Sequence, residues 1–153
     1  MRFLLGWACA LLVVSFVPGV ERWAIHATLL SLGSVCRIFT RSVLVANPDF
    51  VLGGTPVTIS PDCTPLMPTA ALWVAILAYP APRRWKLTGL LAGAGLLWLY
   101  NLGRILTTVS VLKTRPQWFE FVHVYLWQTV TVIAVFGLFV LWLRFEPRPR
   151  SAP

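Results

Sequence analysis

The stretch LTGLLAGAGLLWLYNLGRILTTVSVL, residues 87–112, decides the fold class of this chain. It is almost entirely apolar, and its only charged residue is Arg104. An α-helix needs about 20 such residues to cross the ~30 Å hydrocarbon core of a bilayer. The stretch is longer than that, so it predicts a transmembrane helix.

The composition of the whole chain agrees with this prediction. Of its 153 residues, 58% are hydrophobic and 12% are charged, whereas a soluble domain usually has about 25% charged residues. So few charges cannot solvate a water-facing surface of normal size. A single water-soluble domain is therefore excluded.

Three further apolar stretches, at residues 3–20, 66–80 and 119–143, are predicted spans. The first looks like a signal sequence but has no A-x-A cleavage site, so we expect an uncleaved helix with its N-terminus inside. A basic loop at 80–86 separates the second span from the third. The sequence thus predicts an all-α membrane protein, one integral domain over 1–153 with about four transmembrane helices.

Residues 21–65 are predicted to lie outside the membrane. Residues 23–45 are apolar but contain His26, Arg37 and Arg41, which are costly in lipid. We therefore expect an interfacial or protein-packed helix there. Residues 50–59 predict a short hairpin, because the paired glycines at 53 and 54 suit a tight turn.

The net charge of +8, from 13 Lys and Arg against 5 Asp and Glu, is first a topology signal in such a chain. With both termini cytoplasmic, Arg104 lies within the membrane and five basic residues lie outside. We therefore expect a multi-pass protein of the plasma or inner membrane that contacts lipids and does not bind nucleic acid. Seven basic residues are then cytoplasmic: Arg2, Arg83, Arg84, Lys86, Arg144, Arg148 and Arg150.

Three cysteines, an odd number, give no complete disulfide framework. Cys9 lies in an apolar run and resembles a small hydrophobic residue, whereas Cys63 has polar neighbours. Asp62 or Thr64 is predicted to cap the helix that follows, and a helix N-terminus favours the thiolate form of a cysteine. Asp62 opposes this effect, so a reactive Cys63 requires a nearby cation.

The predicted topology brings three reactive side chains to the outer face. Arg104 lies about 25 Å along a helix that starts at residue 87, close to the far side of a ~30 Å core. His123 lies in the first turns of the next span, and Cys63 precedes the second span. We therefore expect Cys63, Arg104 and His123 to meet in one shallow pocket.

Supporting residues share helix faces with this set. Asn101 and Thr108 lie on the same helix face as Arg104. Glu120 shares a face with His123 and either orients its ring or is an ordinary solvent-facing carboxylate. The alternative for the whole set is structural: an inert thiol, a snorkelling arginine and an interfacial histidine. His26 is also interpreted as interfacial; no spacing predicts metal ligands, so no metal or cofactor is expected.

At these residues the chain resembles the exosortase and archaeosortase family of integral-membrane sorting enzymes. The family shares a Cys that opens one helix, an Arg late in a following helix and a His early in the next. The matching segments are ISPDCT (59–64), NLGRI (101–105) and FVH (121–123). The family usually has Gly two residues after the Cys, where this chain has Pro65, and more helices upstream.

The resemblance implies a cysteine transpeptidase or protease without a cofactor. Cys63 would be the nucleophile, His123 the general base and acid, and Arg104 the stabilising cation. The implied substrates are secreted proteins with a C-terminal motif, a transmembrane helix and a basic tail, cleaved at the outer face of the inner membrane through a thioester. The alternative is a small non-enzymatic membrane subunit that scaffolds a larger assembly through polar pairs between helices.

Overall fold

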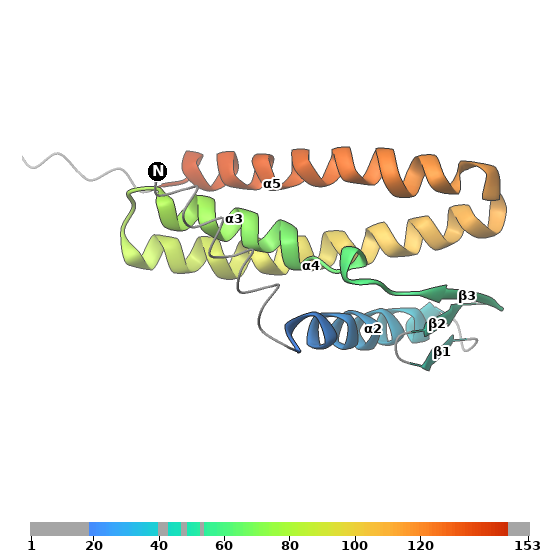
Figure 1. Ribbon diagram of the computed structural model, residues 1–153. Helices are drawn as coiled ribbons and strands as arrows, with labels where there is room; N and C mark the ends of the chain where they lie inside the picture. The colour runs from blue at the N-terminus through green and yellow to red at the C-terminus, as the bar shows by residue number, and fades with distance from the viewer. Residues whose placement is uncertain (1–18, 40–42, 47–48, 53, 147–153) are drawn as a thin grey trace, which may run out of the picture.

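The computed structural model describes residues 19–39, 43–46, 49–52 and 54–146. The predicted first span lies almost wholly outside these residues, as do Cys9, Arg2, Arg148 and Arg150. Four α-helices and one antiparallel sheet make up the described part (Figure 1). They are α2 (Val20–Phe39), β1 (Val43–Ala46), β2 (Asp49–Leu52), β3 (Thr55–Thr58), α3 (Leu66–Ala78), α4 (Arg83–Thr114) and α5 (Trp127–Arg144).

Helix α4 is the longest helix described and contributes residues to both hydrophobic cores. It has 32 residues, so at ~1.5 Å per residue it is about 48 Å long. Its first half packs against α3 and α5, and its second half packs against α2 and the sheet (Figure 1). The helix begins directly after Pro82, so the predicted basic loop is shorter than expected: Arg83, Arg84 and Lys86 already belong to the first turns of α4.

Two described helical segments are long and apolar enough to cross a membrane: Arg83–Thr114 and Pro116–Arg144. They contain the predicted spans at 87–112 and 119–143. Helix α3 is shorter than the predicted span at 66–80, because it has 13 residues, about 20 Å. Pro65 lies at its N-cap and Pro80 follows its end. The described residues thus contain two spanning-length helices where the sequence analysis predicts more.

The region before Cys63 is helical and then extended. The prediction of one helix over 23–45 is wrong at its C-terminal end, because α2 ends at Phe39 and residues 43–46 form β1. Three of the four β1 residues are Val or Leu, and short apolar runs of this kind do not distinguish helix from strand by periodicity. The predicted hairpin is confirmed by β2 and β3, and Gly54 has the positive φ of +82° that its turn requires.

The sheet and α2 share one hydrophobic core with the second half of α4. Phe50 of β2 is fully buried in this core. The indole Nε1 of Trp98 also donates a hydrogen bond to Ser31 Oγ over 3.2 Å, which ties α4 to α2. The core holds Ile59, four residues before Cys63, and Cys63 itself packs against it. Its buried members are Leu29, Leu32, Cys36, Phe50, Ile59, Leu102, Ile105 and Val109.

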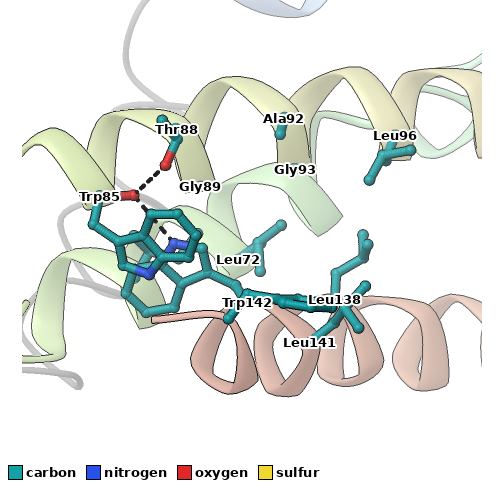
Figure 2. Close-up of a pocket in the computed structure, with 12 residues that line it drawn as sticks. Leu72, Trp85, Thr88, Gly89, Ala92, Gly93, Leu96, Leu138, Leu141 and Trp142 are labelled. Carbon is teal, nitrogen blue, oxygen red and sulfur yellow. Dashed lines mark hydrogen bonds between the residues drawn. The ribbon is translucent and has the colours of Figure 1, made fainter. Parts of the chain in front are cut away.

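A second core lies where α3, α4 and α5 meet, beside an apolar groove of about 190 Å³ (Figure 2). Gly89 and Gly93 lie one turn apart on α4 and permit close helix approach. A Cβ at Gly93 would lie 2.5 Å from Leu72 Cδ2, and one at Gly89 would overlap the Trp142 indole. Trp142 Nε1 donates a hydrogen bond to the Trp85 carbonyl over 3.1 Å, so this end of the bundle is closely packed.

Candidate active site around Cys63

One pocket brings the three predicted reactive residues together. Cys63, Arg104 and His123 line a cavity of about 140 Å³ between the segment that follows β3, the second half of α4 and the helical turns before α5. The three residues are far apart in sequence and come from three separate elements. The other lining residues are Val57, Thr58, Ile59, Ser60, Ile105, Thr108, Val109, Leu112 and Phe119.

Cys63 ends a short 3₁₀ turn, Pro61–Cys63. Its N–H donates to the Ser60 carbonyl over 2.9 Å, and Pro61 begins the turn, where a proline loses no needed donor. The predicted capping of α3 by Asp62 or Thr64 is wrong, because Pro65 is the N-cap residue of this helix. Thr64 Oγ1 donates instead to the Pro61 carbonyl over 2.7 Å, and α3 has no side-chain cap at its N-terminus.

Two further polar contacts surround Cys63. Asn101 Nδ2, on α4, donates to the Cys63 carbonyl over 2.8 Å, and the Asn101 side chain is only 3% exposed. Ser60 Oγ lies 3.5 Å from Cys63 Sγ. Sequence reasoning missed Ser60, although its place three residues before Cys63, with a proline between, could have indicated the shared turn. Together these contacts fix the backbone of Cys63 on α4 and place a hydroxyl beside its sulfur.

Arg104 holds the same turn. Its guanidinium donates to the Asp62 carbonyl over 3.3 Å, a contact that uses one of the five N–H donors of an arginine. Thr108 is buried and donates from Oγ1 to the Arg104 carbonyl over 2.8 Å. Asn101, Arg104 and Thr108 therefore form the polar stripe on α4 that the sequence predicts, and this stripe meets the Cys63 turn.

His123 belongs to a π-helical segment, η3 (Phe121–Leu126), between the 3₁₀ turn η2 (Pro116–Trp118) and α5. Its ring stacks on Phe119, with centroids 5.3 Å apart and planes at 8°. Of the two readings of Glu120, the structure agrees with the solvent-facing carboxylate: the side chain is exposed and accepts no hydrogen bond from His123 in the described part of the chain. A π-helical turn is wider than an α-helical one. Phe119, four residues before His123, therefore lies against the ring, and Glu120, three residues before it, does not.

The pocket also contains charges that act on the imidazole. Arg104 and Asp62 both lie within electrostatic range of His123. Asp62 itself is exposed, and its backbone carbonyl rather than its carboxylate contacts Arg104. The carboxylate is therefore a solvent-facing charge at the edge of the pocket.

The other described cysteine has a different environment. Cys36 is 4% exposed within the core shared by α2 and α4, and burial raises the pKa of its thiol. A thiol in such a place is a poor nucleophile, because the reactive form is the thiolate. Cys63 is half-buried and faces the pocket. Of these two thiols, Cys63 is the one placed for chemistry.

The remaining histidine lies elsewhere. His26 is an exposed residue of α2 and does not line the pocket. Among the residues that the structure describes, no group of three or more His, Cys, Asp and Glu side chains could hold a metal ion.

No family model, curated protein or solved structure matches this chain. Any functional assignment therefore depends on the geometry of the pocket and on the short motifs that its residues form in the sequence.

Proposed function

We propose that this chain is a membrane-embedded cysteine transpeptidase or protease of the exosortase kind. The observation that supports the proposal most directly is that Cys63, Arg104 and His123 line one pocket. A nucleophile, a proton carrier and a fixed cation are the three parts that acyl transfer by a thiol needs.

In the first half of the proposed reaction, Cys63 Sγ attacks the carbonyl carbon of a peptide bond in the substrate. His123 accepts the thiol proton and then donates it to the departing amine, which leaves a thioester on Cys63. In the second half, an amine, a hydroxyl group or water attacks the thioester and gives its proton to His123. That proton returns to Cys63 as the acyl group leaves.

Arg104 supplies the electrostatic part of the proposal. The N–H groups that do not contact Asp62 would donate to the oxyanion of the tetrahedral intermediate. In other enzymes, removal of one such donor costs about 3–4 kcal/mol of transition-state stabilisation. The contact with Asp62 also keeps the guanidinium beside the turn that carries the nucleophile, so little reorganisation is required during the reaction.

The proposed membrane orientation follows from the positions of the charges. The start of α4, with Arg83 and Arg84, and the end of α5, with Arg144, lie at one end of the bundle, whereas the Cys63 turn lies beside the middle of α4 (Figure 1). Because basic residues collect on the cytoplasmic side, the pocket would face outwards and both termini inwards. Exposed apolar side chains of α5, among them Val132 and Phe136, would contact lipid.

The proposed substrate is a secreted protein with a C-terminal motif, a transmembrane helix and a basic tail. The cytoplasmic basic residues of this chain would repel such a tail, and anionic lipid between them would screen the repulsion.

The test is a Cys63→Ala variant assayed in membranes for processing of a C-terminally tagged secreted protein. We expect processing to be lost, and Cys36→Ala, the matched control, to retain it. Hydroxylamine would cleave the thioester, releasing the substrate as a peptidyl hydroxamate and regenerating the Cys63 thiol, and this hydroxamate would identify the intermediate. Normal processing by a well-expressed Cys63→Ala protein would refute the cysteine mechanism and favour the scaffolding subunit.

A further inference from the structure

Strand β3 has one unpaired edge, and this edge adjoins the pocket. In the described part of the chain the strand order is β1-β2-β3, so β3 pairs with β2 only. Four successive residues from β3 onwards, Val57, Thr58, Ile59 and Ser60, line the same pocket as Cys63. A free strand edge therefore leads directly to the proposed nucleophile.

The pairing register identifies the backbone groups at the free edge. Leu52 and Thr55 close the hairpin with two residues between them, and the closing pair of such a hairpin is hydrogen-bonded. Hydrogen-bonded and non-hydrogen-bonded pairs alternate along antiparallel strands. Pro56 and Thr58 are therefore at non-hydrogen-bonded positions, and their backbone groups point away from β2.

The free edge offers three backbone groups: the Pro56 carbonyl, the Thr58 N–H and the Thr58 carbonyl. None of them takes part in a hydrogen bond to another element of the described chain. Pro56 has no N–H, which is acceptable only where a strand position faces away from its partner. The Thr58 hydroxyl is already used, because it donates to Asp49 Oδ1 over 2.8 Å.

We propose that the peptide segment preceding the cleaved bond of the substrate binds as an added strand along this edge of β3. The inference rests on the proposed function and extends it to the mode of substrate recognition. Main-chain hydrogen bonds would supply affinity in a sequence-independent way, as in other cases of strand addition. The positive charge of Arg104 complements the carbonyl oxygen that would arrive beside Cys63.

The direction of the added strand follows from the path of this chain. From β3 the chain passes through the Cys63 turn into the apolar helix α3 (Figure 1). A substrate that continues from an external segment into a transmembrane helix takes the same path. It would therefore lie parallel to β3, with its scissile bond beside Cys63. The opposite wall, formed by Val109, Leu112 and Phe119, favours apolar substrate side chains.

The test uses peptidyl chloromethyl ketones on the full-length protein in detergent. The probe is acetyl-Val-Val-Ala chloromethyl ketone, unmodified or N-methylated at one nitrogen at a time. Cys63 Sγ displaces chloride from the ketone, forming a C–S bond with release of the thiol proton. Mass spectrometry of the Cys63 peptide then gives the labelling rate. Iodoacetamide lacks the peptide backbone of the probe, so its labelling rate measures the intrinsic reactivity of the Cys63 thiol.

Strand addition predicts an alternating pattern. N-methylation at a nitrogen that donates to Pro56 or Thr58 should slow labelling about fivefold, equivalent to ~1 kcal/mol for one hydrogen bond. Methylation at the neighbouring nitrogen should have little effect. In a Thr58→Pro variant, which lacks the edge N–H, labelling by the unmodified probe should fall by a similar factor relative to labelling by iodoacetamide. The methylation series on the unaltered protein remains decisive if Thr58→Pro fails to fold.

The outcomes separate the two proposals. Normal iodoacetamide labelling of Cys63 without an alternating effect of N-methylation would overturn strand addition and leave the cysteine mechanism standing. Failure of Cys63 to react with either reagent would overturn both. An alternating effect of N-methylation, together with slower labelling of the Thr58→Pro variant by the unmodified probe, would support the inference.

Discussion

The buried amide of Asn101 provides a sharp test of how the proposed nucleophile, Cys63, is positioned. In an Asn101→Ala variant the Cys63 carbonyl loses the donor that lies 2.8 Å away. Asn101 is 3% exposed, so water replaces the donor poorly, and an unsatisfied buried acceptor costs about 1–3 kcal/mol. The same energy would raise the population with a detached Cys63 turn by a factor of about 5 to 150.

Two assays should move in opposite directions in this variant. Processing of the tagged substrate should fall, because Cys63 is less often aligned with Arg104 and His123. Alkylation of Cys63 by iodoacetamide should become faster, because a detached turn exposes the half-buried thiol. If the variant were simply less folded, alkylation of the buried Cys36 would become faster as well. Faster alkylation of Cys63 alone therefore indicates a detached turn.

The controls isolate the hydrogen bond from the change in shape. Thr107→Ala removes an exposed hydroxyl that bonds only to carbonyls of its own helix, and it should behave as the unaltered protein does. Asn101→Asp keeps the side-chain shape but turns an acceptor towards the Cys63 carbonyl, so it should impair processing at least as much as Asn101→Ala. An Asn101→Asp protein with normal processing and normal alkylation would refute the positioning role.

Two further substitutions test the cation and the helix packing. Arg104→Lys keeps the charge but loses the planar fork that contacts Asp62; we expect processing to fall about a hundredfold, the ~3 kcal/mol of one oxyanion donor, at an unchanged thermal midpoint. A normal rate would show that charge alone suffices. Gly93→Ala should lower the thermal midpoint because its Cβ meets a leucine of α3, whereas Gly95→Ala, with open space around it, should not. Equal midpoints for the two glycine variants would contradict this packing.

The long apolar stretches were the most predictable part of the fold. Residues 87–112 and 119–143 predict helices of spanning length because few polar residues interrupt them, and both lie within such helices in the structure. The hairpin was equally accessible, since paired glycines between apolar runs strongly indicate a tight turn. In each case the signal is local in sequence.

Features that depend on tertiary contacts were less accessible. Strand β1 continues an apolar run and forms a strand because β2 provides a partner for it. The stacking of Phe119 on His123 depends on a π-helical turn that no pattern of residues in the sequence predicts. The predicted membrane topology brought Cys63, Arg104 and His123 to one face, but the tether from Asn101 becomes visible only when α4 and the Cys63 turn are placed together.

The side chains that line the pocket are held by two different parts of the structure. Asn101 and Arg104 bind the Cys63 turn to α4, so the thiol and the guanidinium belong to one rigid unit. His123 belongs to the segment that leads into α5, and this segment contacts α4 at the residue before Asn101, where the Tyr100 hydroxyl is 2.9 Å from Thr131 Oγ1. A sliding or tilting motion of that segment would move the proposed proton acceptor while leaving the proposed nucleophile and its cation in place. In the proposed reaction, proton transfer is therefore the step whose geometry such a motion would alter most directly.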